Sequence, residues 1–547
     1  MEDLNSVEAC PKTTTIVRRL FSAFIIPIGI GVPLSVAILC VQLLQEEKTK
    51  LFFIGLDGMC FYLAAGLLFL VIMGIALLRF RPRLIYLFVS VLAISSVFYG
   101  ASKLLRIDGY NGDRTPRIVW RWKPKAEQHI KEYLTSRKVP EIALSIENLF
   151  RPTLNDFPEI HGGNPATRMD RVDIQSDWNT NPPKLLWRHP VGIGWSGFAV
   201  VGNAAVTLEQ RDEYECVVCY ELHNGIELWC HREKARFNHE HGDGPRSTPT
   251  IHDGRVYSMG ATGIVTCLEF KTGEKHWSQS VFSDPTTQNL IFGMSGSPLF
   301  VDGLVVVTPG AGVGGATIAF DMQTGAMVWS SGDDPASYAS PIVATLFGKK
   351  QILSFNGAGL RSFALDGQAL WFQPWVTQGE SRVNVAQPVV VSESTRLEDG
   401  ARVLISSGYD KGTALLNVSL DKDRWSSQVV WESKSLKSKL SSVVVHENFV
   451  YGFDNGILAC IDLTNGKRSW KAGRYGHGKM LLVRNKLLIQ AESGEVVLVA
   501  ANPTAHLELA RFEALTSKTW NEIALSGNIM VVRNDCEAAA ILLPINE

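Results

Sequence analysis

The chain is poor in cysteine and almost neutral, and both properties exclude classes of protein. Nine cysteines in 547 residues are too few for a fold held together by disulfides. A formal net charge of −1 gives no bulk attraction for nucleic acid, so no nucleic-acid partner is expected. Long apolar runs occur only in the first 100 residues. Any helix that crosses a membrane is therefore expected there.

Three apolar stretches, 20–44, 51–78 and 84–100, follow a short polar tail. About 20 apolar residues are needed to cross a bilayer. The first stretch is too long for a cleavable signal peptide and lacks a small-residue cleavage site. We therefore predict a cytoplasmic tail over 1–19 and a three-helix transmembrane anchor over 20–100.

Basic residues around these stretches predict the orientation. Three lie before the first stretch, at positions 12, 18 and 19, and three crowd the loop before the third, at positions 79, 81 and 83. Lys and Arg accumulate on the cytoplasmic side of a membrane. Three crossings then put residue 101 onward outside, which predicts an inner-membrane protein with a periplasmic domain.

Five short segments repeat one pattern, a polar tight turn with Gly followed by a strand that ends in Trp. They are 223–229, 271–277, 323–329, 365–371 and 464–470. Trp187 and Trp431 extend the series without the full turn, and successive Trp residues lie between 39 and 60 residues apart. This is the period of a β-propeller blade. One such unit cannot bury its own apolar face, so the array is expected to close on itself.

The strand order within a repeat predicts four-stranded blades. An inner strand, often opened by Ser-x-Pro as at 295–301, leads through two apolar strands to the Trp strand. Eight such outer strands occur, and Ala510 takes the Trp position in the last. The segment 521–545 supplies three strands, and 184–187 supplies a lone fourth. We predict an all-β, eight-bladed propeller over 183–547 that closes by pairing these two segments, with seven blades as the alternative count.

The segment 101–182 is predicted to be a linker with a short helix at 125–137. It begins basic and aromatic, with Trp120 and Trp122 set among Arg and Lys. Two interpretations stay open. These Trp side chains rest on an anionic bilayer surface, or they belong to a strand packed on the propeller.

The cysteines fit the repeat. Cys219 occupies a position of the repeat that is cysteine or alanine in other repeats. This composition indicates that the position is occupied by a small buried residue. Cys216 and Cys219 form a CxxC, but a strand would point them to opposite faces, so no metal or redox site is predicted there. A disulfide between Cys219 and Cys230 on adjacent strands is compatible with an oxidising compartment.

The turns with a closing Trp resemble the repeats of the quinoprotein β-propellers that bind pyrroloquinoline quinone (PQQ), over roughly 184–545. In that family the Trp docks on the Gly peptide of a neighbouring turn. Together with the apolar N-terminus, segments such as 193–221 and 452–478 resemble membrane-anchored PQQ-like repeat proteins of planctomycete-type bacteria. The resemblance implies one of three roles: a periplasmic dehydrogenase with PQQ and Ca²⁺ on the axis, a non-catalytic propeller that holds partner proteins in outer-membrane assembly, or a membrane-tethered sensor.

The equipment of a dehydrogenase is not evident. Such enzymes need a divalent cation with oxygen ligands and a carboxylate base, and they commonly carry two adjacent cysteines. The chain has no adjacent cysteine pair, and no set of Glu, Asn and Asp matches the calcium ligands. We favour a membrane-anchored, non-catalytic binding or scaffold module at the cell envelope, in contact with the lipid bilayer and protein partners. The alternative is a PQQ- and Ca²⁺-dependent alcohol or sugar dehydrogenase that feeds electrons to the membrane.

A candidate ligand site remains at one mouth of the axial channel. The turns that enter the innermost strands present six residues there: Trp195, Arg246, Tyr338, Asn384, His477 and Trp520. Nearby loops are expected to add Glu209 and Arg211. Aromatic rings beside Arg, Asn and His suit a flat or anionic ligand. The alternative is that the aromatic rings plug the channel while Arg246 neutralises buried carbonyl or carboxylate groups.

Overall fold

The computed structural model describes residues 83–137, 146–163, 168–282, 289–310, 315–378, 382–392 and 400–546. The chain divides into two compact units. The first runs to Asp108 and includes Ile118–Lys123, and the second comprises Gly109–Arg117 and the chain from Pro124 onward.

The first unit contains α3 (Arg83–Leu104). Its end leads into a two-stranded hairpin of β1 (Leu105–Tyr110) and β2 (Pro116–Trp120), whose tip belongs to the second unit. Within the described residues, no helix is both long and apolar enough to cross a membrane, contrary to the crossing predicted at 84–100. The crossings predicted at 20–44 and 51–78 lie outside the described residues.

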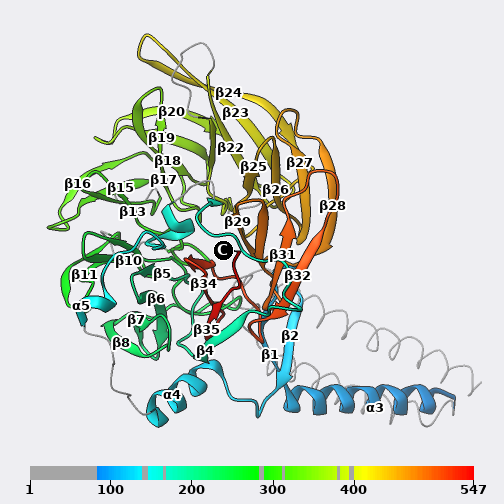
Figure 1. Ribbon diagram of the computed structural model, residues 1–547. Helices are drawn as coiled ribbons and strands as arrows, with labels where there is room; N and C mark the ends of the chain where they lie inside the picture. Colours follow the sequence, from blue (N-terminus) through cyan, green and yellow to red (C-terminus); the bar gives the residue numbers. More distant parts are fainter. Residues whose placement is uncertain are drawn as a thin grey trace, which may run out of the picture. The chain divides into compact units, whose positions relative to one another are not determined.

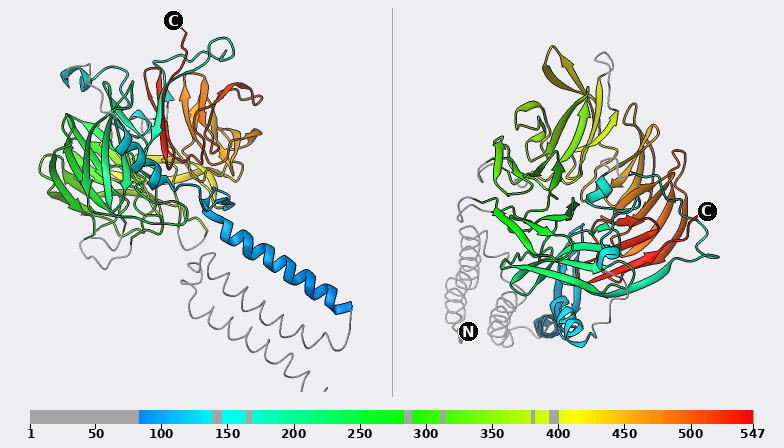
Figure 2. Two further views of the ribbon diagram at one scale, coloured as in Figure 1. Left: turned by 90° about the horizontal axis from the view of Figure 1, so that it is seen from below. Right: turned by 60° about the vertical axis from the view of Figure 1, so that its left-hand side comes forward.

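The second unit is a ring of eight sheets around an axis (Figures 1 and 2). The first four sheets, numbered as blades 1 to 4 along the chain, are regular. Blade 1 consists of β5 (Ala199–Val201), β6 (Ala204–Arg211), β7 (Tyr214–Glu221) and β8 (Glu227–Glu233). Blade 2 consists of β9 (Thr250–His252), β10 (Arg255–Met259), β11 (Ile264–Glu269) and β12 (Lys275–Ser280). Blade 3 consists of β13 (Leu299–Val301), β14 (Leu304–Val307), β15 (Thr317–Asp321) and β16 (Met327–Ser331). Blade 4 consists of β17 (Ile342–Leu346), β18 (Lys349–Phe355), β19 (Gly359–Phe363) and β20 (Ala369–Pro374).

Blades 5 to 8 complete the ring. Blade 5 consists of β21 (Val389–Ser392), β22 (Ala401–Ser407), β23 (Gly412–Asp421) and β24 (Arg424–Ser433). Blade 6 consists of β25 (Val444–His446), β26 (Phe449–Asp454), β27 (Ile457–Asp462) and β28 (Arg468–Arg474). Blade 7 consists of β29 (Lys479–Val483), β30 (Lys486–Gln490), β31 (Glu495–Ala500) and β32 (Glu508–Glu513), with β3 (Arg168–Met169) added beside β29. Blade 8 consists of β33 (Ala524–Ser526), β34 (Ile529–Arg533), β35 (Glu537–Leu542) and β4 (Lys184–Pro190).

The ring closes as predicted. β4 pairs with β35 in antiparallel register, with Trp187 opposite Ala540. The strand that precedes blade 1 thus completes blade 8 as its outermost strand, and β35 is paired on both sides. The count of eight blades is confirmed over the alternative of seven.

The Trp residues of the outer strands join neighbouring blades. Trp470 of blade 6 donates to the Asn502 carbonyl, in a turn of blade 7 that contains no Gly. In five other blades the indole Nε1 donates a hydrogen bond of 2.8–3.1 Å to a backbone carbonyl next to the Gly turn of the following blade: Trp187, Trp229, Trp277, Trp329 and Trp431. The indole also covers that turn. A Cβ at Gly325, whose φ is +71°, would lie 2.5 Å from the Trp277 ring. The turn therefore needs Gly both for its backbone conformation and for contact with the indole.

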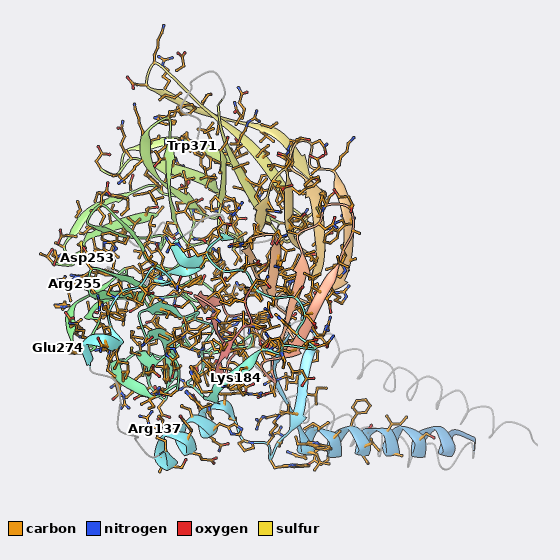
Figure 3. The ribbon with its side chains drawn as sticks, in the orientation of Figure 1. Arg137, Lys184, Asp253, Arg255, Glu274 and Trp371 are labelled. Carbon is orange, nitrogen blue, oxygen red and sulfur yellow. The ribbon has the colours of Figure 1, made fainter. Side chains whose placement is uncertain are left out.

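Two junctions depart from this scheme. Blade 5 carries the long β23–β24 hairpin instead of a Gly turn, and Trp371 of blade 4 bonds Gln351 Oε1 within its own blade at 2.9 Å (Figure 3). In blade 7, Ala510 replaces the Trp. Trp178, from the segment before β4, packs edge-on against Phe512 in the same apolar cluster.

The segment before β4 contains α4 (Ala126–Ser136), α5 (Ile146–Leu149) and the 3₁₀ helix η2 (Ile160–Gly163). α4 lies within the segment predicted as helical. Its Tyr133 ring stacks on His189 of β4 at 4.9 Å, and Arg137 pairs with Glu227 of β8. These residues thus pack on the propeller as well as connecting to it.

The Ser-x-Pro motifs build the inner wall of the ring. The backbone N–H of Thr248 donates to Ser297 Oγ, and that of Ser297 donates to Ser340 Oγ. The Gln387 N–H donates to Ser442 Oγ in the same way. Each hydroxyl satisfies a buried backbone donor of the preceding blade, which is why hydroxyl residues open these strands.

Candidate functional site

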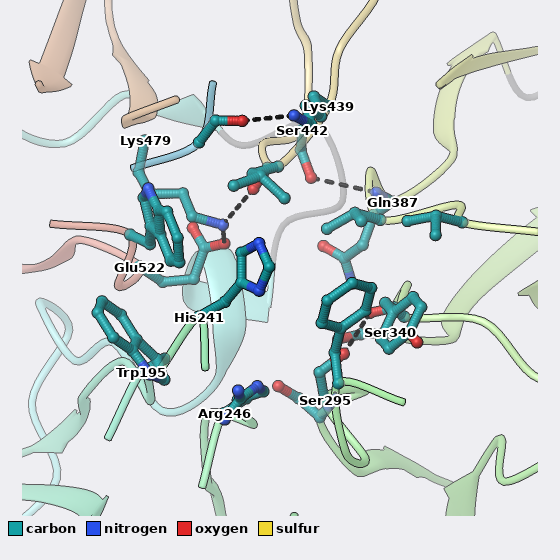
Figure 4. A pocket seen from close by; sticks show the side chains of 18 of the residues that line it. Trp195, His241, Arg246, Ser295, Ser340, Gln387, Lys439, Ser442, Lys479 and Glu522 are labelled. Atoms are coloured by element: carbon teal, nitrogen blue, oxygen red, sulfur yellow. Dashed lines mark hydrogen bonds and ion pairs between the residues drawn. The ribbon is translucent and has the colours of Figure 1, made fainter. Parts of the chain in front are cut away.

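A cavity of about 330 Å³ lies where the inner-strand entries of all eight blades converge. We call it the axial chamber. Figure 4 shows Trp195, Arg246, Lys439 and Lys479 arranged around it. Four of the six predicted site residues line it: Trp195, Arg246, Tyr338 and Trp520. The other two, Asn384 and His477, do not belong to its lining.

Aromatic rings form one wall of the chamber. Trp195 and Trp520 lie 5.0 Å apart between ring centroids. The Lys518 ammonium lies over both rings, at 4.6 and 4.2 Å from their centroids. Trp195 is only 7% exposed, and its Nε1 has no hydrogen-bond partner among the described residues. This buried donor is available to a ligand with an acceptor atom.

Arg246 provides positive charge beside this aromatic wall, since it bonds Gly242, which lies against the Trp195 ring. Its guanidinium donates to the Gly244 and Gly242 carbonyl oxygens, both at 2.6 Å, and lies over the Phe237 ring. Within the described residues no carboxylate lies within ion-pair distance of it. Burial lowers the pKa of Arg246 to about 10, so the guanidinium still carries its charge at neutral pH. It neutralises carbonyl groups, as the alternative interpretation expected, while it also faces the chamber.

The remaining charges of the lining are mostly positive. Arg114, Lys439 and Lys479 contribute cations, and Glu522 is the one acidic residue of the lining. Lys479 Nζ and His161 Nε2 both contact the Glu522 carboxylate. Although burial disfavours its charge, these partners lower the pKa of Glu522 to about 2. The net positive lining favours an anion.

Asn384 and His477 have structural roles. The Asn384 side chain donates to the Asn356 carbonyl at 2.7 Å and accepts from Ser407 Oγ at 2.6 Å. His477 Nε2 lies 3.0 Å from a carboxylate oxygen of Asp113.

Residues Gly109–Arg117, the tip of the β1–β2 hairpin, cover the mouth of the chamber. We call them the mouth loop. Asn111, Gly112 and Arg114 belong to the chamber lining. The sequence interpretation placed this segment in a linker, since it carries none of the repeat signals of the blades. Lys439, Lys479 and Glu522 were missed as well, because the inner-strand entries of blades 6 to 8 lack the Ser-x-Pro pattern.

Glu209 and Arg211 do not lie in loops at the mouth, as was expected. They belong to β6, and Glu209 is fully buried. Its carboxylate accepts from Gly192 N, Arg211 Nε and Tyr220 Oη at 2.6–2.9 Å. Arg533 of β34, also fully buried, donates to the Leu208 and Gly192 carbonyls. This network ties blade 8 to blade 1.

The cysteine disulfide considered from the sequence is absent among the described residues. Cys219 lies opposite Trp229 on β8, and both Cys219 and Cys230 are free thiols. Cys219 and Cys216 belong to different apolar clusters, as expected for opposite faces of a strand. Cys216 shares a face with Cys230, and Arg211 Nη1 lies 3.7 Å from Cys230 Sγ.

The chamber does not fit PQQ together with Ca²⁺. A calcium site needs six to eight oxygen ligands, usually with several carboxylates. Glu522 is the sole carboxylate of the lining and is already held by Lys479. Four cationic side chains in the lining would repel a divalent ion. An anion alone fits the same residues.

Known structures share the fold at low sequence identity. Quinohemoprotein alcohol dehydrogenase from Comamonas testosteroni matches with a TM-score of 0.52 and 12% identity, over 77% of this chain and 85% of that one. BamB from Moraxella catarrhalis matches with a TM-score of 0.48 and 13% identity, over 66% of this chain and 100% of that one. A search of curated proteins returned no match.

A protein-family model covers β4 and the chain through most of blade 6. The match runs over residues 184–472, which is more than half of the chain, and contains the strand β4 that closes the ring. The repeats, the docking of five Trp side chains on the next Gly turn and this match agree with one another. The chain therefore belongs to the family described as outer membrane protein assembly factor BamB, whose fold it shares with the quinoprotein dehydrogenases.

Proposed function

We propose that this protein is a non-catalytic binding module of the cell envelope, in which the propeller holds partner proteins and the axial chamber binds a small anionic ligand. The observation that carries the ligand is the composition of the chamber. Four cations face it with one carboxylate, and that carboxylate is already paired. The family description supports the protein-binding role.

The rival function is a quinoprotein oxidoreductase. The shared fold and the aromatic wall of Trp195 and Trp520 favour it. The lack of carboxylates for a divalent cation in the lining weighs against it. The two functions differ in one measurable property, which is electron transfer from an alcohol.

Ligand titration of the full chain should separate these functions. We expect citrate, a small polycarboxylate, to raise the melting temperature in a saturable way, because a ligand that binds only the folded state adds RT ln(1 + [L]/Kd) of stability. Arg246→Ala should abolish the shift, since it removes a cation that faces the chamber. Arg484→Ala, a half-exposed residue outside the chamber, is the matched control and should leave the shift intact.

The same samples test the rival. With PQQ, Ca²⁺ and a primary alcohol, we expect no reduction of an artificial electron acceptor. Acceptor reduction would replace our proposal by the oxidoreductase. If neither citrate nor PQQ alone shifts the melting temperature, the ligand part of the proposal fails and only the protein-binding part stands.

We further propose that the N-terminal part holds the module at the inner membrane. The apolar stretches 20–44 and 51–78 support this. The orientation predicted from the sequence depended on a third crossing at 84–100, which the structure contradicts. Trp120 and Trp122 are 50% and 66% exposed and stack at 4.7 Å between centroids. β2 pairs with β1 and with no blade. This favours the bilayer surface over the propeller as the partner of the two Trp side chains.

Brominated lipids should quench the tryptophan fluorescence of the full chain in anionic vesicles. Trp120 is the first tryptophan of the sequence, so the predicted anchor contributes no signal. We expect the quenching to disappear in the double variant Trp120→Ser, Trp122→Ser, because indole rings prefer the interfacial region. Trp425→Ser, in the β23–β24 hairpin, is the control and should retain it. Equal quenching in both variants would contradict the proposal.

A further inference from the structure

The mouth loop is held by three different blades, largely through its backbone. Lys439, at the entry of blade 6, donates to the Gly112 carbonyl. Glu492 of blade 7 accepts from the Gly112 N–H at 2.6 Å. Lys518, at the entry of blade 8, donates to the Tyr110 carbonyl at 2.8 Å. Recognition of both the backbone donor and the backbone acceptor of one residue, Gly112, indicates a specific binding position rather than a chance contact.

Side chains of the loop add two further contacts, one at its centre through Asp113 and one at its C-terminal end through Arg117. Asp113 bonds His477, and this contact is the main cause that lowers the pKa of the Asp113 carboxyl. Arg117 bonds Ser517 and lies 3.9 Å from Asp535. These partners lie outside the chamber lining. The loop is thus attached around the rim while its tip covers the cavity.

Gly112 is required at the closest approach. A Cβ at this position would lie 2.0 Å from His477 Cδ2 and 3.0 Å from its Cβ. His477 is almost fully buried and is held by Asp113, so its ring has little room to move. Any other residue at 112 must therefore push the loop out of its seat.

We propose that the mouth loop is a lid built into the chain, which closes the axial chamber and must leave its seat before a ligand enters. Both ends of the loop continue directly into β1 and β2, which lead to the first unit. A displacement of the first unit would therefore be transmitted to the lid through both β1 and β2. The closure is independent of the proposed function, whereas its control of ligand entry rests on it.

Limited trypsin digestion of the full chain tests the closure without any ligand. The bond between Arg114 and Thr115 lies within the loop, and the bond between Arg121 and Trp122 lies beyond it and serves as an internal reference. We expect the first bond to be cut at least about tenfold more slowly than the second, since proteolysis follows the open population. Gly112→Ala should remove this difference. Gly100→Ala in α3, where an added Cβ meets nothing within 4 Å, should retain it.

A second variant guards against misfolding of Gly112→Ala. Asp113→Asn with Arg117→Gln removes the ion pairs of the loop and leaves the blades unchanged, so it should speed cleavage at Arg114 in the same direction. Equal cleavage of the two bonds in the wild type, or no change in either variant, would overturn the lid.

Citrate association followed in parallel separates the two proposals. Faster association in Gly112→Ala supports control of entry. If cleavage speeds up and citrate binds to neither protein, the lid stands and the ligand fails.

Discussion

Replacement of Glu209 by glutamine should lower the free energy of unfolding by about 3–5 kcal/mol. The carboxylate is fully buried and accepts three hydrogen bonds, one of them from Arg211. Its loss leaves Arg211 and the neighbouring Arg533 buried with too little negative charge. An uncompensated buried charge destabilises the folded state far more than an exposed one. The loss of unfolding free energy should therefore be many times larger than for a surface substitution.

Urea denaturation of the wild type and the variant measures this difference. Glu495→Gln, which breaks a surface pair with Arg511, is the control and should cost less than about 1 kcal/mol. A loss below that value for Glu209→Gln would show that the network does not join blades 8 and 1.

The pH dependence of Glu209→Gln gives an independent check. Burial favours the neutral acid, but Arg211 and Arg533 outweigh it and lower the pKa of Glu209 below its usual value. The stability that this carboxylate contributes is therefore present above the unfolded pKa and is lost as the pH falls through the folded pKa. Glu209→Gln should be destabilised most near neutral pH and converge with the wild type in acid.

Trp277→Ala should cost about 3–5 kcal/mol, the usual range for a buried indole. Trp277 is 7% exposed, packs in the apolar core between blades 2 and 3, and bonds the Met322 carbonyl. The loss opens a cavity at the junction and uncovers the Gly325 turn. Thermal unfolding with matched urea titrations measures the change.

Two further variants divide this effect. Trp122→Ala removes an exposed indole and should change stability by less than about 0.5 kcal/mol. Trp277→Phe keeps most of the packing but deletes the N–H donor, and should cost about 1–3 kcal/mol because the Met322 carbonyl then lacks that donor. A Trp277→Ala variant as stable as Trp122→Ala would mean that the repeated Trp does not bind the blades together.

The propeller was predictable because each blade repeats the same arrangement of turn, strands and packing residues. A Gly turn, a small residue such as Cys219 and a closing Trp each report a backbone or packing constraint that the neighbouring blade imposes. The pairing of β4 with β35 followed from counting strands, since one end supplies three and the other supplies one. The spacing of the repeats was therefore enough to predict the number of blades and the closure of the ring.

The chamber was predictable only in part. Trp195, Arg246, Tyr338 and Trp520 lie where the inner turns were expected, because the repeat places them there. The mouth loop lies outside the repeat, and its contacts depend on tertiary structure that no pattern encodes. Glu209 was misplaced because a charged residue favours a surface assignment, whereas here buried arginines compensate its charge.

The pairing of β4 with β35 in blade 8 also imposes an order on biosynthesis. β4 is made before blades 1 to 7, and its partner β35 is made after them. The growing chain must therefore carry an open sheet edge past the synthesis of seven other blades. The α4 helix, whose Tyr133 stacks on β4, is available from the start and can shelter that edge. Cooperative stability should then arise only after blade 8 has been made and β35 closes the ring by pairing with β4.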